Sequence, residues 1–306
     1  MDNFYESTDS ISEAQRIFND LRYFLQTGSF NLTKWITTNN DILASIHEEH
    51  RDISFDELLD KTTTKRVLGI QWDIASDSLV FWPNNFYDLL KKKRTQWNLL
   101  HTSSSVFDPI GIAAPFTIPL RILQRSVWRQ GLSWDDPLSN GNLPEFFTLL
   151  SEINQLQVVS IPRQYFFHKY SKLSLHVFSD ASYAALALVA YIVYIEEITN
   201  QRSISLALGK ARVAPLKQHA ITKLELQAAL IGSRLVKFIK THSSKFIKTP
   251  AYLFTDSSTV LQRIHGPDKR QQIFVANRVG EILDLPLASQ WKYCPGNLNP
   301  ADDGTR

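Results

Sequence analysis

Along the first part of the chain, apolar and polar positions form short, dissimilar patterns. Residues 11–26 carry apolar side chains at helical spacing, which predicts a helix. Residues 30–35 (FNLTKW) alternate as a short strand does, whereas the polar residues 41–64 predict a loop or a weak helix. Two further apolar runs, 66–73 and 77–82, predict strands joined by a short turn.

The middle of the chain predicts helices separated by turn-forming segments. Residues 91–130 have a mostly helical pattern, which the prolines and the glycine of residues 107–116 (FDPIGIAAPF) interrupt. A turn-rich connector leads to another helix near 144–156. The polar residues that follow, 160–172, predict a boundary between domains.

From Leu173 onward the pattern changes to that of an α/β layer. One long helix there has an apolar stripe that runs from Leu224 to Phe238. The elements expected in order are strands 173–179, 184–195 and 202–209, helix 223–240, strand 250–255, helices 257–264 and 272–284, and strand 289–293. Three strands followed by alternating helices and strands predict one sheet of mixed direction with flanking helices.

Composition limits the class of protein. With 306 residues, 43% of them hydrophobic, the chain can bury a core of about two domains. The single cysteine, Cys294, excludes a disulfide framework and a cysteine-cluster metal site, and it fits a reducing compartment. The longest apolar run, 183–195, is too short to span a bilayer, and no signal peptide is visible. We therefore expect a cytoplasmic or nuclear protein with no membrane partner.

Charge is unevenly distributed around a net value of +3. Residues 1–60 are acidic, whereas residues 61–130 and 172–306 are basic. Basic blocks of this kind predict a polyanionic partner, although ordinary solvated surface explains them equally well. The same two interpretations apply to the basic run 91–94 (KKKR), as a phosphate contact or as a solvated helix face.

Four carboxylates stand at the ends of the predicted elements. Asp180 ends the first strand of the C-terminal sheet, and Asp256 ends the fourth. Glu225 lies in the first turn of the long helix, and Asp302 lies where a last helix should begin. If the fold gathers them at one sheet edge, they repel one another, and a hard divalent cation such as Mg²⁺ relieves that repulsion. Two such ions would support phosphodiester cleavage.

Each acid also has a purely structural explanation. Thr222 and Glu225 fit a capping box at the start of the long helix. Asp180 and Asp256 could be N-caps, and Asp302 could favour a helix N-terminus through the helix dipole. The sequence alone leaves both interpretations open.

Several segments resemble a known family. The motifs FSDAS, LGKARVAPLKQHAITKLELQAAL, FTDSSTVLQRI, FVANRVGEI and NPADDGTR are similar to the ribonuclease H-like domain of BEL/Pao-type retrotransposon polyproteins. Upstream, RVLGIQWD, SSSVFDPIGIAAPFTI and LSWDD resemble that family's connection segment, and GSFNLTKW resembles the end of its polymerase palm. The resemblance implies a reverse-transcriptase palm and thumb remnant (1–90), a mostly helical connection segment (91–171) and a C-terminally truncated ribonuclease H-like domain (172–306) with a mixed five-stranded sheet.

The resemblance also implies roles for particular residues. Asp180, Glu225, Asp256 and Asp302 would be the metal-binding and catalytic acids of a nuclease that cuts the RNA strand of RNA:DNA hybrids with two Mg²⁺ ions, for which Mn²⁺ can substitute. Lys210, Arg212 and Arg278 would contact phosphates. The partners implied are an RNA:DNA hybrid and the rest of the retroelement polyprotein.

The sequence departs from the family pattern in several places. Asp2 and Asn3 stand where the family has two polymerase acids, so a competent polymerase is not expected. Ala187 replaces a common glycine, Thr222-Lys223 replaces Pro-Arg, and Cys294 and Asn297 stand near the last acid, where many ribonucleases H have a histidine. The family also carries a peptidase name, but the chain lacks the Asp-Thr/Ser-Gly triplet of aspartic peptidases.

Two other functions remain open. The chain could be a catalytically inactive nucleic-acid-binding remnant of a retroelement. It could also be a structural connector of a larger polymerase, in which the cluster 91–94 and its neighbouring helices position template and primer.

Overall fold

The computed structural model describes residues 4, 6–8, 10–54, 57, 64–67, 70–80, 92–156, 159–166, 169–217, 219–266, 272–284 and 288–306. The predicted polymerase remnant at Asp2 and Asn3, and Lys91 of the basic run, lie outside these residues. The chain forms two compact units, residues 1–80 with 160–164, and residues 81–159 with 165–306. The division into three segments that the resemblance implies stays a prediction.

The first unit begins with the helix expected from the apolar spacing. Helix α1 (Ile11–Thr27) starts where the Ser10 hydroxyl accepts a hydrogen bond from the Glu13 amide, and it is followed by α2 (Asn40–Ser45) and η1 (Glu48–His50). The strand predicted at 30–35 is wrong, because this segment makes only one isolated β-bridge, from Trp35 to Arg51. Lys34 has φ of 57°, a left-handed conformation that interrupts an extended strand.

A four-stranded antiparallel sheet completes this unit. Its order is β1 (Thr64–Val67), β2 (Ile70–Asp73), β3 (Ser78–Val80) and β4 (Ser160–Pro162). The turn between β2 and β3 lies where the sequence predicts it. The single strand predicted at 66–73 is wrong, because this stretch is divided between β1 and β2, which pair antiparallel. Strand β4 was not predicted, since three residues with little apolar pattern pair with a segment far away in the chain. Beside β4, Arg163 holds the Asp77 carboxylate with two hydrogen bonds of 2.7 and 2.9 Å.

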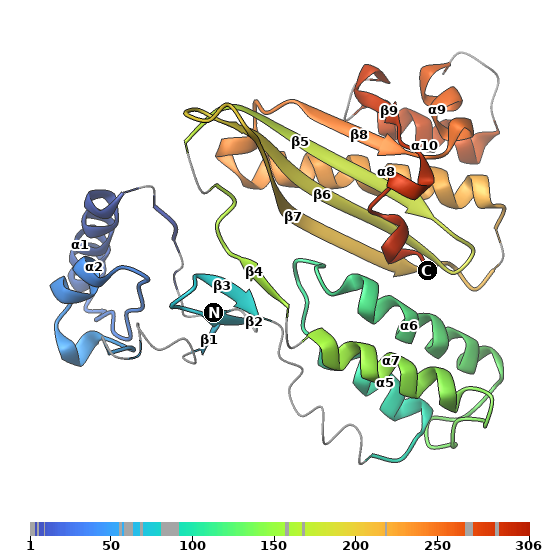
Figure 1. Ribbon diagram of the computed structural model, residues 1–306, viewed down its shortest axis with the longest axis horizontal. Helices are drawn as coiled ribbons and strands as arrows, with labels where there is room; N and C mark the ends of the chain where they lie inside the picture. The colour runs from blue at the N-terminus through green and yellow to red at the C-terminus, as the bar shows by residue number, and fades with distance from the viewer. Residues whose placement is uncertain are drawn as a thin grey trace. The chain divides into compact units, whose positions relative to one another are not determined.

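Three helices open the second unit (Figure 1): α5 (Gln96–Ser105), α6 (Ala114–Arg129) and α7 (Leu143–Gln155). The break predicted at 107–116 falls between α5 and α6, where the Asp108 carboxylate accepts hydrogen bonds from the amides of Gly111, Ile112 and Ala113. Pro115, however, does not break the helix. It lies in the first turn of α6, where a missing amide hydrogen costs no helical bond.

The C-terminal sheet has five strands in the order β7-β6-β5-β8-β9. Strands β5 to β7 are antiparallel, whereas β8 and β9 run parallel to β5. The elements are β5 (Tyr170–Ala181), β6 (Ala185–Glu196), β7 (Arg202–Val213), α8 (Ile221–His242), η3 (Ser244–Phe246), β8 (Ala251–Thr255), α9 (Ser258–His265), α10 (Ile273–Leu283), η4 (Ala288–Gln290), β9 (Trp291–Tyr293), η5 (Gly296–Leu298) and η6 (Asp302–Gly304). The mixed five-stranded sheet with flanking helices predicted from the sequence is confirmed.

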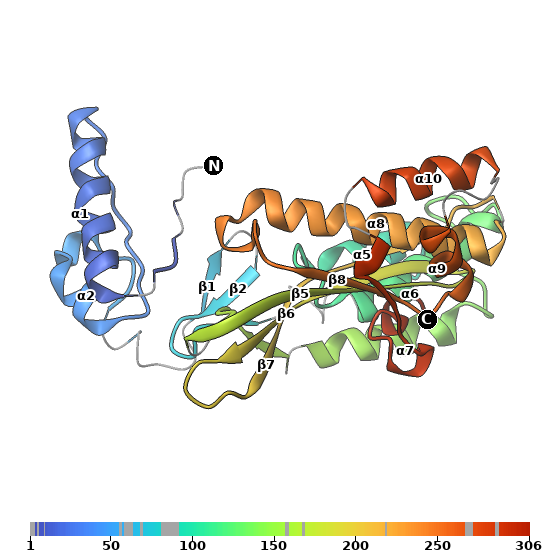
Figure 2. The same ribbon diagram turned by 90° about the horizontal axis from the view of Figure 1, so that it is seen from above.

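Helix α8 covers one face of this sheet, and α10 packs on the outer side of α8 (Figure 2). Buried side chains of β5 such as Leu175 and Val177 meet Leu226 and Leu230 of α8 in the main core. The apolar stripe predicted on this helix is only partly buried, because Phe238 is 53% exposed. Contacts with the sheet on one side and α10 on the other make the buried surface of α8 wider than one stripe.

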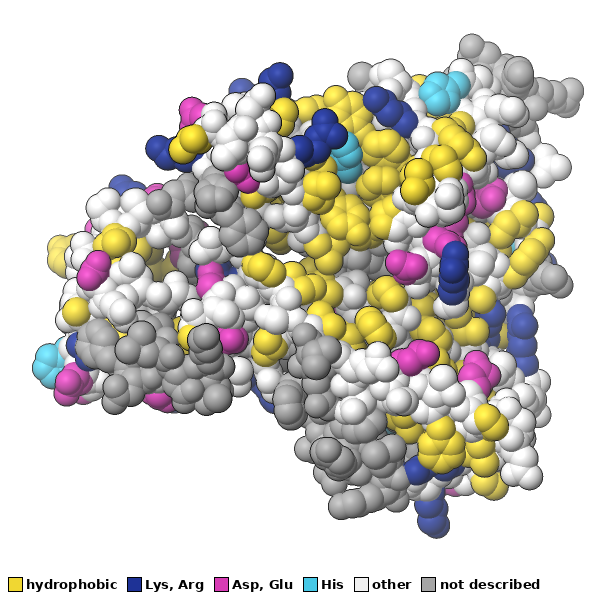
Figure 3. Space-filling view, viewed as in Figure 1, with side chains coloured by type: hydrophobic (Ala, Val, Ile, Leu, Met, Phe, Trp, Pro, Cys, Tyr) yellow, Lys and Arg dark blue, Asp and Glu magenta, His cyan; other side chains and the backbone are white. Residues whose placement is uncertain are grey.

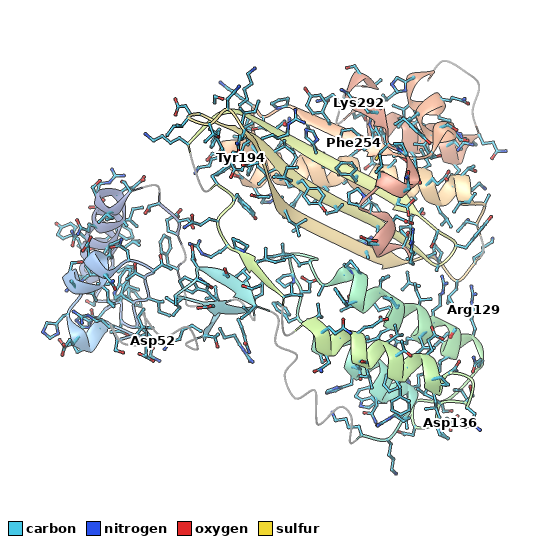
Figure 4. All side chains as sticks on the ribbon, viewed as in Figure 1. Asp52, Arg129, Asp136, Tyr194, Phe254 and Lys292 are labelled. Carbon is cyan, nitrogen blue, oxygen red and sulfur yellow. The ribbon has the colours of Figure 1, made fainter. Side chains whose placement is uncertain are left out.

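The opposite face of the sheet carries aromatic side chains (Figure 3). Phe178 stacks on Phe254 at 4.6 Å between ring centroids, and His176 lies 5.4 Å from Tyr252. Lys292, in register with Phe254 on the neighbouring strand, places its ammonium 4.8 Å from the Tyr252 ring (Figure 4). These residues alternate along each strand with those that face α8.

Candidate active site

Parallel pairing of β5 and β8 brings two of the predicted acids to one edge of the sheet. Ser179 is in register with Thr255, so Asp180 and Asp256, the next residue in each case, follow at neighbouring strand positions. Asp180 is only 9% exposed, and its Oδ2 accepts a 2.5 Å hydrogen bond from the Thr305 hydroxyl. Neither aspartate is the N-cap of a helix, so the structural explanation of both residues is wrong.

Glu225 reaches the same edge from α8. The capping box expected for Thr222 and Glu225 does not form, because α8 begins at Ile221 after Ala220, without a side-chain cap. Instead, the Ser257 hydroxyl donates a 2.7 Å hydrogen bond to Glu225 Oε2. The same Ser257 oxygen accepts from the Val260 amide and so caps α9. Glu225 is thereby tied to the residue that follows Asp256.

The C-terminal segment adds the fourth acid. Asp302 lies in the first turn of η6, where its dipole interpretation still applies, and its carboxylate pairs with Arg306. This segment lies close to the sheet, since a Cβ added to Gly304 would lie 2.7 Å from Ala187 Cβ. Asn299 also holds the segment in place, because its side-chain amide donates to the carbonyl of Ser179 at 3.1 Å. Ala187, an exception to the family pattern, therefore lies under η6.

The charges of the other three acids act on the Asp256 carboxyl. Burial raises the pKa of the Asp256 carboxyl, and the charges of Asp180, Glu225 and Asp302 raise it further. A hydrogen bond to its own backbone amide opposes these effects. Gly296 leaves room beside this carboxylate, because a Cβ at that position would lie 3.1 Å from Asp256 Oδ2. Acids that are far apart in the sequence are thus electrostatic neighbours.

Cys294, noted in the sequence because it lies near the last acid, is buried beside this site. Its thiol donates to the carbonyl of Pro295 at 3.6 Å. Burial, and then the charge of Asp256, raises the pKa of the thiol. A thiol with a raised pKa forms the nucleophilic thiolate less readily than an ordinary cysteine does.

The donor chemistry of the four acids fits a hard divalent cation. Carboxylate oxygens are the ligands that Mg²⁺ prefers, and a bound cation would relieve the repulsion that raises the pKa of Asp256. Among the described residues, no three His, Cys, Asp or Glu side chains stand in a ready-made metal-binding arrangement. Thr305 and Arg306 each hold one carboxylate oxygen, of Asp180 and of Asp302 respectively.

The three basic residues predicted to contact phosphates are not gathered with the acids. Lys210 and Arg212 flank Ala211 on β7. Ala211 pairs with Ala187 of β6, which in turn pairs with Asp180 of β5. Because side chains alternate along a strand, both residues point to the face opposite Asp180. Arg278 belongs to α10, and its guanidinium lies 3.5 Å from the centre of the Phe274 ring. Their contact with phosphates stays a prediction.

Sequence reasoning missed the residues that hold the acids. Ser257 and Thr305 each lie within three residues of an acid, in TDSS and ADDGT, but nothing in those motifs shows which carboxylate they bond. Asn299 bonds a strand far away in the sequence. Only the three-dimensional pairing identifies such partners.

Among the described helices, none combines the length and the apolar character that a membrane-crossing segment needs. No curated protein matches the chain.

Several solved structures are similar to this chain at low sequence identity. Ribonuclease H1 from the halophilic archaeon Halobacterium salinarum NRC-1 is 10% identical, with a TM-score of 0.27 over 44% of this chain and 89% of that one. LC11-RNase H1 in complex with an RNA/DNA hybrid is 13% identical, with a TM-score of 0.30 over 43% and 92%.

A foamy viral protease–reverse transcriptase in complex with double-stranded DNA is 13% identical, with a TM-score of 0.42 over 76% of this chain and 44% of that one. The family comparison is stronger than these. Residues 95–257 match the family described as "Pao retrotransposon-like RNaseH-like domain", and this segment covers α5 to β8 with three of the four acids. The chain belongs to this retrotransposon family, and its C-terminal sheet is of the ribonuclease H-like type.

Proposed function

We propose that the chain is a retroelement-derived ribonuclease that hydrolyses the RNA strand of RNA:DNA hybrids. Asp180, Glu225, Asp256 and Asp302 would be its metal-binding and catalytic residues. The observation that carries this proposal is the parallel pairing of Ser179 with Thr255, which brings Asp180 and Asp256 to one edge of the sheet, where Ser257 also bonds Glu225. A site that concentrates negative charge in this way lowers the stability of the folded protein, and such a cost is typical of functional sites.

Bound Mg²⁺ ions would supply a nucleophile at neutral pH and stabilise charge on the leaving oxygen. The protein's own contribution is to orient the ligands. Thr305 fixes one oxygen of Asp180, and Ser257 fixes one oxygen of Glu225. Burial of Asp180 limits its contact with water and strengthens its electrostatic interactions. Hybrid binding would rest on phosphate contacts from the basic part of the chain and on the 2′-hydroxyls of the RNA strand.

The proposal is tested with a labelled RNA:DNA hybrid in the presence of Mg²⁺ or Mn²⁺. Asp180→Asn, Glu225→Gln and Asp256→Asn should each lower the rate of RNA cleavage by ~10²-fold or more, as expected when an electrostatic component of an active site is lost. Asp303→Asn is the matched control, because Asp303 is exposed and adjacent to Asp302. It should cleave at nearly the rate of the parent chain.

The folded state gives a second measurement for the same variants. Removing one charge from a repelling cluster should raise the melting temperature of Asp256→Asn without metal, even as cleavage is lost. Cleavage at the parent rate by Asp180→Asn would rule out the proposed catalytic site. Loss of cleavage together with unfolding would assign the acids to stability instead.

One contact favours a second candidate function, hybrid binding without cleavage. The Arg306 guanidinium pairs with Asp302, so a positive charge already lies at the acid cluster. If this pair persists, it opposes cation binding at Asp302. Binding with a steep salt dependence, no cleavage by the parent chain, and cleavage gained in Arg306→Gln would support this second function.

A further inference from the structure

A cavity of about 310 Å³ lies between helix α6, the turn between β5 and β6, and the segment that connects β7 to α8. Arg125 and Arg129 line it from α6, Tyr183 from the turn between β5 and β6, and His219 from the connection between β7 and α8. Its floor includes Leu224, the residue before Glu225. Tyr183 follows Asp180 by three residues in the chain, and α6 also contacts η6, which carries Asp302.

Two arginines line this cavity. The Arg125 and Arg129 guanidiniums donate to the carbonyls of Ala214 and Leu216 at 2.9 and 2.7 Å. Each guanidinium has five N–H donors, so these bonds leave most of them available. In the described part of the chain, neither arginine forms an ion pair with a carboxylate.

The two positive charges also affect each other. Burial lowers the pKa of Arg125, and the charge of Arg129 lowers it further. An anion between the two side chains would relieve this repulsion. Guanidinium groups bind phosphate oxygens through pairs of parallel hydrogen bonds, which favours phosphate over a simple halide. The exposed Tyr183 ring, 61% accessible, stands at the same cavity and offers a surface for the adjoining sugar or base.

We propose that this cavity binds one backbone phosphate of the nucleic-acid strand whose neighbouring phosphodiester lies at the four acids. This inference deepens the proposed function and rests on it for the identity of the strand, but not on cleavage. Helix α6, which lies outside the five-stranded sheet, thereby supplies positive charge for the strand in addition to Arg306, which pairs with Asp302. The position of the strand would be set by Arg125 and Arg129, which are positioning residues because they do not touch the reacting atoms.

The test measures binding of a fluorescent RNA:DNA hybrid to the Asp180→Asn chain without divalent metal, over a range of salt concentrations. Arg125→Gln and Arg129→Gln should each weaken binding by about 10-fold, the scale of one lost charge-assisted hydrogen bond. Each should also reduce the slope of log affinity against log salt by about one, as expected for one lost phosphate contact.

Arg202→Gln is the matched control. Arg202 is exposed on β7. It pairs with Ile195 of β6, which pairs with Lys172 of β5, eight positions before Asp180. At the rise of a β-strand, Arg202 therefore lies ~26 Å from Asp180 along the strand direction. The substitution also removes one positive charge, but from the five-stranded sheet and not from α6, and it should change affinity by less than about twofold. Arg129→Lys keeps the charge but not the paired geometry, so its affinity should fall between those of the parent and Arg129→Gln.

The outcomes separate the two proposals. If the parent chain does not cleave but Arg129→Gln loses affinity and salt slope, the phosphate site stands and the nuclease proposal fails. If the parent cleaves but both arginine variants bind like Arg202→Gln, the phosphate site is ruled out and the nuclease proposal stands. Equal salt slopes in the parent and Arg129→Gln, with a lower melting temperature in the variant, would assign the arginines to docking of α6 alone and overturn the inference.

Discussion

The acids of the candidate site are held one at a time by neighbouring side chains. Thr305 bonds Asp180, Ser257 bonds Glu225, and Arg306 pairs with Asp302. Each contact fixes one carboxylate oxygen. Orientation by such neighbours is how ligand side chains are normally kept in place before a metal binds. Among the described residues, Asp256 has a hydrogen bond with its own backbone amide, and it is the one of the four acids whose pKa is raised.

His176, on the aromatic face of the sheet, predicts a pH dependence of stability. Burial lowers its pKa from the ordinary value of 6.5, and the charges of Arg202 and Lys292 lower it further. The unfolded chain therefore takes up the proton first as the pH falls. The stability contributed by the neutral ring is complete above pH 6.5 and is lost as the pH falls from 6.5 through the folded-state pKa.

The measurement is the free energy of unfolding in denaturant at pH 7.5, 6.5 and 5.5. His176→Phe keeps a ring against Tyr252 and Phe254 and should show a smaller loss of stability on acidification than the parent chain. His242→Phe, at the exposed end of α8, serves as the control and should follow the parent. Identical pH profiles for His176→Phe and the parent would contradict the assignment.

At the scale of elements, two glycines join α6 to the sheet. Gly111 has φ of 79°, and a Cβ there would lie 1.9 Å from the carbonyl oxygen of Gly209 on β7. The Gly209 amide donates to the carbonyl of Ile110 at 2.7 Å, so the loop before α6 covers the free edge of β7. Gly111→Ala should therefore reduce stability through both strain and collision.

A matched glycine separates these two effects. Gly131 has φ of 75° but open space around it, so Gly131→Ala should cost only the conformational strain, about 1 kcal/mol. Gly280→Ala, in α10 with no atom near the added Cβ, should instead stabilise the protein by about 0.5–1 kcal/mol. Unfolding free energies measure all three. A cost for Gly111→Ala no larger than that for Gly131→Ala would mean that the loop does not press on β7.

The elements of the C-terminal sheet could be predicted because their own residues encode them. Leu175 and Val177 alternate with polar or aromatic positions on β5, and the apolar spacing of α8 continues for several turns. The predictions were wrong where contacts between distant residues, or the dihedral angle of a single residue, determine the local structure. Strand β4 depends on pairing with β3, and the strand expected at 30–35 is interrupted at Lys34. The expected capping box does not form, and Glu225 accepts a hydrogen bond from Ser257 instead.

For the whole molecule, the meeting of distant acids could be anticipated, because parallel strands end at one edge of a sheet. Asp180 and Asp256 follow that rule through the pairing of Ser179 with Thr255. The basic cavity could not be anticipated. The spacing of Arg125 and Arg129 places them on one face of a helix. Nothing in the sequence indicates that they donate hydrogen bonds to the carbonyls of Ala214 and Leu216. Contacts between a helix and a distant loop are established only by the three-dimensional structure.

These contacts lead to a prediction about where the chain can be divided. The structure places residues 81–159 in one compact unit with the C-terminal sheet. A chain of residues 92–306 keeps the Gly209–Ile110 bond and the two arginine bonds, whereas a chain of residues 172–306, the boundary expected from the sequence, loses all three. At about 1 kcal/mol for each bond, the shorter chain should be less stable by ~3 kcal/mol or more.

Hydrogen exchange gives the decisive local measurement. The amide of Gly209 should be protected in residues 92–306 and should exchange rapidly in residues 172–306, because its acceptor at Ile110 is then missing. The shorter chain should also associate through the uncovered edge of β7, which light scattering would detect. Residues 160–162, whose partner strand β3 belongs to the other unit, should be unprotected in the chain of residues 92–306, which lacks β3. Equal stability of the two chains, with Gly209 protected in each, would show that the helices before residue 160 do not support the sheet.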